Sequence, residues 1–326
     1  MKPLRALPLL TLLAAPALAQ PPAAPAKPAA EPEIDLDALY RQGKQLFDDY
    51  APPEVKREFY FPSKQEWDAF AARLQAALDQ NDLGELAAYE PEARAALNAL
   101  RLFPDYADYA EWLEERLDYI QAAGVAARQP GAALPPKPPV LKPGQRPPLA
   151  TPDIPYFNLW LARMRVRPAP ARATALLPVA QAAFAAEGVP AELAWLAEVE
   201  STFNPSARSP AGARGLYQFM PTTAKALGLS TWLPDERTDP AKSARAAARY
   251  LRTLHGKFGD WPLALAAYNA GEGRVRRLLA TQKARTFAAI APGLPAETRM
   301  YVPKVLATLQ VRAGVAPGRL AAPRAG

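Results

Sequence analysis

The sequence contains no cysteine and only one histidine, His255. Without cysteine, the chain can form no disulfide and offers no thiol for a lipid anchor. With one histidine, it cannot build a metal site from clustered histidines. Stability must therefore come from packed cores, and a chain of 326 residues is long enough to build two of them.

Long apolar runs are scarce as well, and the one that stands out opens the chain. Lys2 and Arg5 precede an apolar stretch at 7–15, and the small-residue pattern Ala-Leu-Ala follows at 17–19. This order is typical of a secretory signal peptide over residues 1–19. An uncleaved anchor is the alternative, but the run is too short to span a bilayer. We therefore expect an exported protein of the periplasm or cell envelope that is not lipid-anchored.

Neither sign of charge is in large excess. The net charge is +7, and it falls by two to +5 when Lys2 and Arg5 leave with the signal peptide. A basic balance can indicate nucleic-acid binding. The basic residues are scattered, however, and no nucleic-acid motif is present, so we expect no nucleic-acid partner. A mild positive charge also suits an anionic polymer.

Proline-rich stretches divide the chain into blocks. We predict a disordered Pro/Ala-rich tether at 20–33 and a Pro-rich linker at 128–153. Between them, residues 34–127 are predicted to form a small helical domain of unknown role. Its segments with helical periodicity are 36–47, 67–78, 93–102 and 109–120. A larger domain is predicted at 154–315, followed by a disordered tail at 316–326.

A short helix with one acid on its apolar face is the most informative local feature. Proline is favoured in a first helical turn, so the helix should begin near Pro190; it should end by Asn204, which precedes a proline. Glu200 falls on the apolar side, and Glu198, two residues earlier, is expected to face water. The apolar side also contains Leu193, Leu196, Ala197 and Phe203.

Burial on this face would give Glu200 the properties of a general acid. Removing a carboxylate from water disfavours its charged form and raises its pKa, as proton transfer near neutral pH requires. A buried glutamate that is ion-paired to an arginine for structural reasons is the alternative. Periodicity alone leaves both interpretations open.

Four motifs follow one another across residues 200–302. The first is Glu200-Ser201 with Asn204-Pro205, and Ser209 lies nine residues after the glutamate. The next are Gly-Leu-x-Gln-x-Met-Pro at 215–221, Ala-Tyr-Asn-x-Gly at 267–271 and Glu-Thr-x-x-Tyr-Val at 297–302. This arrangement resembles the soluble lytic transglycosylase (SLT) family, which has a goose-type-lysozyme-like catalytic domain. It looks most similar to the membrane-bound lytic transglycosylase D branch.

The resemblance covers residues 154–313 and implies an all-α fold, with a lysozyme-like helical catalytic domain preceded by the small helical domain. In that family the glutamate, here Glu200, protonates the glycosidic oxygen between N-acetylmuramic acid and N-acetylglucosamine of peptidoglycan. It then takes a proton from the C6 hydroxyl, and a 1,6-anhydro ring closes without water, metal or cofactor. The substrate-binding residues that the resemblance implies are Ser209, Gly215, Gln218, Met220, Tyr268, Asn269 and Glu297.

Several of these residues also have ordinary structural interpretations. Gly215 suits a turn, Met220 and Tyr268 suit a core, and Glu297 suits the first turn of a helix. The resemblance instead makes Glu297 a partner that orients Tyr268 or the sugar. Tyr217 departs from the family, since relatives often carry Met or Trp there, and this change is expected to affect at most a sugar contact.

Two other functions remain open. A hydrolytic muramidase needs a second carboxylate beside the bond. The candidates are Asp235, Glu236 and Asp239, which lie thirty-five or more residues after Glu200. Asp239 with Pro240 is predicted instead to cap a helix. A catalytically inactive wall-binding protein is the other alternative. The aromatic residues of the N-terminal domain are another open question. Such residues are more often core, and the alternative is a face for sugar or for cell-wall protein partners.

Overall fold

The computed structural model describes residues 82–101, 107–128, 153–209 and 212–324, together with residues 2–3, 45, 48–49, 53, 56 and 59–60. The predicted tether lies outside the described residues. So do most of the predicted signal peptide and the linker from 129 to 152.

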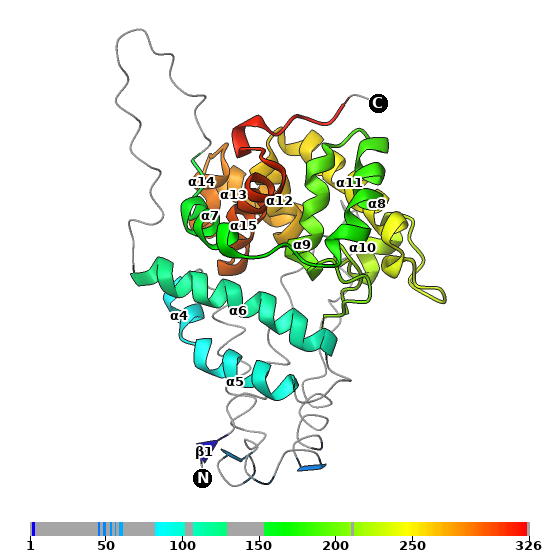
Figure 1. Cartoon of the computed structure of the whole chain (residues 1–326). Helices are drawn as coiled ribbons and strands as arrows, with labels where there is room; N and C mark the ends of the chain where they lie inside the picture. Colours follow the sequence, from blue (N-terminus) through cyan, green and yellow to red (C-terminus); the bar gives the residue numbers. More distant parts are fainter. Residues whose placement is uncertain are drawn as a thin grey trace.

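Helices dominate the described part of the chain (Figure 1). The N-terminal ones are α4 (Leu83–Ala87), α5 (Glu90–Leu100) and α6 (Ala107–Arg128). The later ones are α7 (Phe157–Val166), α8 (Ala173–Ala186), η4 (Ala191–Trp195), α9 (Leu196–Ser201), α10 (Pro221–Ala226), η5 (Glu236–Thr238), α11 (Pro240–Phe258), α12 (Trp261–Ala270), α13 (Glu272–Thr281), α14 (Phe287–Ile290), η6 (Ala291–Gly293), α15 (Ala296–Ala313) and η7 (Pro317–Arg319). The strands described are β1 (Lys2–Pro3) and β2 (Phe59–Tyr60), which pair in parallel. The all-α prediction is confirmed for the described residues.

Helix α15 lies at the centre of the larger helical body, in contact with α7, α9 and α12 (Figure 1). Every residue from Met300 to Leu309 is buried, and so is every residue of α12. A helix that is buried on all sides can keep charged residues only if each one finds a partner. The charged and hydroxyl side chains of α15 are therefore the points at which neighbouring helices are fixed.

Asp239 has the capping role predicted from the sequence. Its side chain accepts hydrogen bonds from the backbone N–H groups of Ala241 and Lys242, and Pro240 occupies the first turn of α11. These bonds satisfy N–H groups that have no partner within the helix. Gly259, with φ 67°, ends the same helix. Asp239 is thus engaged in local structure.

Helix α6 packs against α7, α9 and α15, and buried charges join it to α15 (Figure 1). Lys304 on α15 is only 1% exposed, and its Nζ lies 2.7 Å from a carboxylate oxygen of Glu115 and 3.0 Å from one of Asp118. Arg167 pairs with both carboxylates as well. Burial alone would raise the pKa of Glu115, but Lys304 and Arg167 outweigh it and the pKa is lowered. These acids are therefore ionised and paired.

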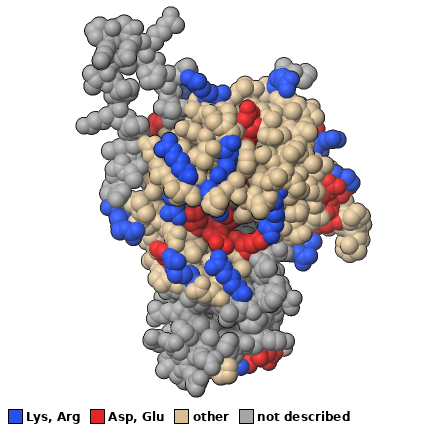
Figure 2. All heavy atoms as spheres, in the orientation of Figure 1, with Lys and Arg blue, Asp and Glu red and all other residues tan. Residues whose placement is uncertain are grey.

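Acidic side chains gather on the surface where α6 meets the helices above it, with Lys and Arg around them (Figure 2). Glu111 contributes an ion pair with Arg172 at 2.8 Å, and Asp118 one with Arg163 at 2.5 Å. Helix α6 belongs to the block predicted as an N-terminal domain. The boundary at the linker stays a prediction, but α6 itself is anchored to the helices that follow it.

The end of the chain differs from the predicted disordered tail. Pro317–Arg319 forms η7, and the indole N–H of Trp261 donates to the carbonyl of Ala321 at 2.8 Å. The N–H of Arg324 donates to the carbonyl of Gly188 at 2.8 Å. The described part of the tail, up to residue 324, is therefore held by hydrogen bonds to buried elements, which composition alone did not reveal.

The buried pairs predict how strongly α6 depends on its charges. Glu115→Gln should lower the free energy of unfolding by about 3 kcal/mol, because Lys304 loses its nearest counter-ion away from water. Glu114→Gln is the matched control: its pair with Arg101 is half-exposed on both sides, and its loss should cost less than about 1 kcal/mol. Urea denaturation of the full chain measures both. Equal losses would show that the buried pairs do not hold α6.

Candidate active site

Glu200 lies on α9, a short helix in which every residue is buried. Pro190 caps η4, which continues directly into α9, so the predicted start near Pro190 is confirmed. The helix ends at Ser201, because the two residues after it take left-handed backbone conformations. Phe203, with φ 57°, is thus not on the helix, although it is fully buried and packs edge-on against Trp195.

The carboxyl group of Glu200 is almost removed from water and has one close hydrogen-bond donor. Glu200 is 5% exposed, and the hydroxyl of Tyr301 on α15 donates to its Oε1 at 2.5 Å. Burial raises the pKa of Glu200 to about 7, against the opposing effects of the Tyr301 hydrogen bond and of Arg116. Such a group is partly protonated at neutral pH and can both give and accept a proton.

The prediction that Glu198 faces water is wrong. Glu198 is 1% exposed, and its two carboxylate oxygens accept hydrogen bonds from the guanidinium of Arg312 at 2.8 and 2.9 Å. Helical spacing does turn Glu198 away from Glu200, but the C-terminal part of α15 covers that side. Glu198 is thus matched to a permanent cation, whereas Glu200 is hydrogen-bonded to a neutral phenol.

The segment between α9 and α10, called the motif loop, contains Ser209, Gly215 and Gln218. These predicted substrate-binding residues form contacts within the loop. Ser209 accepts a hydrogen bond from the N–H of Ala213 through its hydroxyl and donates its own N–H to the Ala213 carbonyl, both at 3.0 Å. The side-chain amide of Gln218 donates to the carbonyls of Gly215 at 2.9 Å and Ala207 at 3.3 Å. Ser201, next to the acid, donates to the Leu216 carbonyl at 2.9 Å. The loop is therefore fixed directly to the helix that contains Glu200.

Gly215 is required by a close backbone contact. Its φ is 80°, and a Cβ atom built there would lie 1.8 Å from the carbonyl oxygen of Arg237. No side chain fits, and the left-handed conformation also favours glycine. The space beside this glycine is filled by the chain's own backbone, so its evident role is to let two loops meet.

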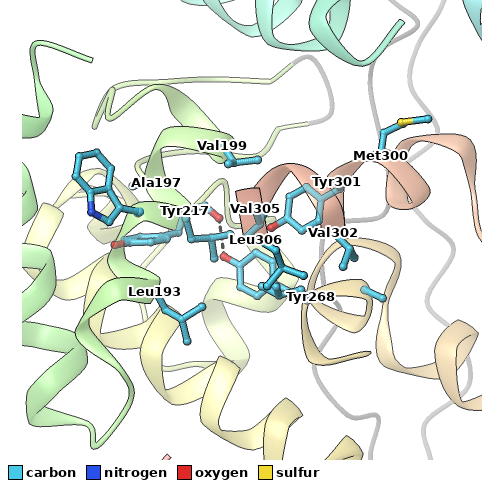
Figure 3. Packing of buried hydrophobic residues seen from close by; sticks show 14 of the residues in the cluster. Leu193, Ala197, Val199, Tyr217, Tyr268, Met300, Tyr301, Val302, Val305 and Leu306 are labelled. Atoms are coloured by element: carbon cyan, nitrogen blue, oxygen red, sulfur yellow. Dashed lines mark hydrogen bonds between the residues drawn. The ribbon is translucent and has the colours of Figure 1, made fainter. Parts of the chain in front are cut away.

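Tyr268 and Asn269 are both 1% exposed and both bonded within the protein. The hydroxyl of Tyr268 donates to the backbone carbonyl of Tyr217 at 2.8 Å, as the dashed line in Figure 3 shows. Thr298 donates to the side-chain oxygen of Asn269 at 2.6 Å. The side chain of Tyr217 is itself buried and donates to the Ala194 carbonyl at 3.3 Å. The departure at Tyr217 is thus a change in the core.

Glu297 has a different partner from the one expected. Its Oε1 lies 3.3 Å from Nε of Arg116 on α6, and both side chains are less than 10% exposed. Burial raises the pKa of Glu297, and Arg116 opposes that rise. Tyr268, which Glu297 was expected to orient, donates to the motif loop instead. Met220, the last predicted contact, is half-buried at the start of α10.

The acids considered as a second catalytic carboxylate are engaged elsewhere. Asp235 accepts hydrogen bonds from the guanidinium of Arg237 at 2.7 and 2.9 Å, and Glu236 pairs with Lys242 at 2.6 Å. Among the described residues, no group of three or more His, Cys, Asp or Glu is arranged to hold a metal ion.

Two side chains at the site were not selected from the sequence. Tyr301 belongs to the last motif, and the motif itself was the signal that could have identified it. Arg116 carries no such signal, because it lies on a separate helix 84 residues before Glu200 in the sequence. The structure thus brings Glu200, Tyr301, Glu297 and Arg116 together from three helices, α9, α15 and α6.

Comparison with known proteins identifies the family of this domain. Residues 178–290 match the transglycosylase SLT domain. The matched stretch contains Glu200, the motif loop and Tyr268, but neither α6 nor α15. The chain therefore carries an SLT-family domain, and the resemblance drawn from the motifs is confirmed.

Individual relatives are enzymes of the same family. Membrane-bound lytic murein transglycosylase D of Escherichia coli K12 is 45% identical over 125 residues, which are 36% of this chain and 27% of the relative. Soluble lytic murein transglycosylase of Salmonella typhimurium is 40% identical over 120 residues, 34% of this chain and 19% of the relative. The crystal structure of a 70 kDa soluble lytic transglycosylase from Escherichia coli matches with 21% identity and a TM-score of 0.41, over 86% of this chain and 50% of that one. The matches thus span about a quarter or less of the length of these two curated relatives.

The pairing of Glu198 predicts a structural role. Glu198→Gln should lower the free energy of unfolding by about 3 kcal/mol, because Arg312 loses a buried, two-point partner. Activity per folded molecule should stay within about twofold, because Glu198 points away from Glu200. Urea unfolding and initial rates measure the two effects. Glu187→Gln, whose pair with Arg252 at 3.6 Å is partly exposed, is the control with a small expected loss.

The raised pKa of Glu200 predicts a pH-dependent stability. The folded-state pKa of about 7 lies above the ordinary glutamate value of 4.5, so the folded protein binds this proton more tightly than the unfolded chain does. Stability from Glu200 is complete below pH 4.5 and is lost as the pH rises through 7.

Glu200→Gln removes that loss. Its thermal midpoint should match that of the unsubstituted chain near pH 4.5 and exceed it increasingly toward pH 8, with a gain in free energy of up to about 3 kcal/mol. Thermal unfolding across this pH range measures the difference. A constant difference at all pH values would mean that Glu200 titrates normally.

Proposed function

We propose that this chain is a peptidoglycan lytic transglycosylase, a carbon–oxygen lyase acting on a polysaccharide, with Glu200 as its catalytic acid and base. The observation that carries the proposal is the buried carboxyl of Glu200, held by Tyr301 and with a pKa of about 7, within a matched SLT domain. The relatives' names, lytic murein transglycosylases, support the same activity and substrate.

The proposed reaction uses one carboxyl group twice. Protonated Glu200 gives its proton to the glycosidic oxygen between N-acetylmuramic acid and N-acetylglucosamine, and the bond from that oxygen to C1 breaks. The resulting carboxylate then takes the proton of the C6 hydroxyl of the muramic residue, and O6 bonds to C1. The 1,6-anhydro ring closes, Glu200 has its proton back, and no water is consumed.

Tyr301 fits this cycle as the group that stabilises the ionised intermediate state of the acid. Its hydroxyl donates to Glu200 Oε1 at 2.5 Å. A donor to a carboxylate favours the charged form and lowers the pKa that burial raises. The pKa therefore stays close to neutral, where proton donation and acceptance are both accessible.

The predicted substrate-binding residues divide by their contacts. We assign a positioning role to those already bonded within the protein, which are Ser209, Gly215, Gln218, Tyr268 and Asn269. Met220 and Glu297 remain as the candidates for direct sugar contact: Met220 is half-buried, and Glu297, although ion-paired to Arg116, lies in the cluster around Glu200.

A hydrolytic muramidase is the second candidate, and Glu297 is the observation that favours it. Glu297 is a second buried carboxyl that acts electrostatically on Glu200, and hydrolysis of a glycosidic bond normally uses two carboxyls. Its ion pair with Arg116 favours a structural or orienting role instead.

We also propose that the enzyme works outside the cytoplasm, on glycan strands of the periplasm or cell envelope. Support comes from the predicted signal peptide at 1–19. Within the described part of the chain, no helix has the length and apolar character to cross a membrane. Cell-wall protein partners of the N-terminal block remain a proposal that rests on its aromatic residues.

Mass spectrometry of digested glycan strands decides between the candidates. A lytic transglycosylase releases products with 1,6-anhydro-N-acetylmuramic ends, and a muramidase releases reducing ends. Glu200→Gln should abolish turnover while the thermal midpoint is kept or raised, because the amide cannot donate a proton as an acid does. For the active chain, kcat/KM should fall about tenfold per pH unit above pH 7, as the acid loses its proton. Reducing ends, or full activity of Glu200→Gln, would contradict the proposal.

A further inference from the structure

A buried arginine outside the matched SLT domain reaches the cluster around Glu200. Arg116 on α6 is 6% exposed, and its Nε lies 3.3 Å from Glu297 Oε1. Glu297 lies four residues before Tyr301 on α15 and therefore on the same helix face, and Tyr301 is bonded to Glu200. One face of α15 thus contacts both Arg116 on α6 and the carboxyl group of Glu200.

We propose that Arg116 is a positioning residue of the active site, which holds the Glu297 carboxylate beside Glu200 and balances its charge. Helix α6 is then a part of the catalytic centre. The inference rests on the proposed function, in which Glu200 is the acid and base. It extends the site beyond residues 178–290, the stretch that the family match covers.

The register of α6 over the site is fixed by the residues that directly follow the acid. The hydroxyl of Thr202 donates to Glu115 Oε1 at 3.1 Å, and the side-chain amide of Asn204 donates to Glu111 Oε2 at 2.9 Å. Glu111 and Glu115 are one helical turn apart and lie to the same side of Arg116 on the helix. The turn after α9 is therefore joined to α6 by two hydrogen bonds, which fix the position of Arg116.

The neighbouring turn of α6 supports the same placement. Tyr119 lies three residues after Arg116, and the guanidinium of Arg116 lies 5.8 Å from its ring centroid. Tyr119 is 2% exposed, and its hydroxyl has no hydrogen-bond partner among the residues that the structure describes. Two adjacent side chains of α6 thus present polar groups to the buried cluster.

The charges around Glu200 explain what Arg116 does. The groups that act on Glu200 come from three helices: Arg116 and Tyr119 on α6, Tyr268 on α12, and Glu297, Tyr301 and Lys304 on α15. Two carboxyls buried together hinder each other's ionisation. Arg116 favours the ionised form of both Glu200 and Glu297, whereas Glu297 disfavours that of Glu200.

These effects predict that replacing Arg116 and replacing Glu297 shift the pKa of Glu200 in opposite directions. Arg116→Gln should raise the pKa of Glu200, even when Glu297 takes up a proton, because Arg116 acts on Glu200 more strongly than Glu297 does. Glu297→Gln should lower the pKa of Glu200, because a nearby negative charge is removed while Arg116 remains. A merely structural pair would give no such opposition of sign.

The pKa of Glu200 can be read without catalysis in the full-length protein. Thermal midpoints with and without Glu200→Gln diverge as Glu200 ionises, so the pH of divergence reports its pKa. That pH should move up by about one unit in Arg116→Gln and down by a similar amount in Glu297→Gln. Arg116→Lys should leave it in place, because the charge is kept. Arg101→Gln, at the half-exposed pair with Glu114, is the control for loss of an arginine near α6.

Kinetics on purified glycan strands give the second readout. Arg116→Gln should lower kcat about tenfold at pH 7 with KM changed less than about twofold, and Arg116→Lys should recover most of the loss. The pH at which kcat/KM begins to fall on the alkaline side should move up in Arg116→Gln and down in Glu297→Gln, as the pH of divergence does. If the pH of divergence shifts as expected but the chain has no lytic activity, the electrostatic role of Arg116 is supported and the proposed function is wrong.

Three results would overturn the inference. The first is a pH of divergence that stays fixed, or moves the same way, in the two variants of the pair. The second is an Arg116→Gln enzyme that matches Arg101→Gln in rate and pH profile. The third is higher activity of Arg116→Gln at every pH, which would make α6 a cover over the site. If Arg116→Gln does not fold, the downward shift expected for Glu297→Gln decides the question.

Discussion

The burial of one carboxyl group, that of Glu200, is the constraint around which the rest of the site is arranged. A carboxylate without water is unstable unless donors or cations replace the solvent. Here a single phenol, Tyr301, supplies the hydrogen bond, and charges of both signs stand nearby. The outcome is neither a permanently ionised group nor a permanently neutral one. Its pKa of about 7 depends on keeping that balance.

Helix α15 supplies most of this balance, because its polar side chains contact the neighbouring helices α9 and α6. Tyr301 reaches the acid on α9, and Glu297 and Lys304 reach α6. Arg312, near the C-terminal end, neutralises Glu198 on the far side of α9. One buried helix thus fixes the acid, the helix that carries it and the helix that covers it. A change in the packing of α15 would therefore displace Glu200, α9 and α6 together.

Two glutamates separated by one residue show how little of this is decided locally. Glu198 and Glu200 share a helix turn and nearly the same exposure, 1% and 5%. One meets the guanidinium of Arg312 and the other the hydroxyl of Tyr301. An ion pair matches the charge of Glu198, whereas a neutral donor beside Glu200 leaves burial as the largest influence on the pKa of Glu200. The difference between the structural glutamate and the proposed catalytic one lies in these distant partners.

The sequence by itself determined the all-α class, the place of Glu200 on a buried helix face, the cap at Asp239 and the SLT motifs, because these follow from short-range spacing and local backbone preferences. It indicated that Glu198 points away from Glu200, but not what covers that side. Only the tertiary structure decided the partners of both glutamates and the place of Arg116, since these contacts join residues more than 80 positions apart. Periodicity describes one helix at a time, whereas the charge environment of a buried group is set by every helix that packs against it.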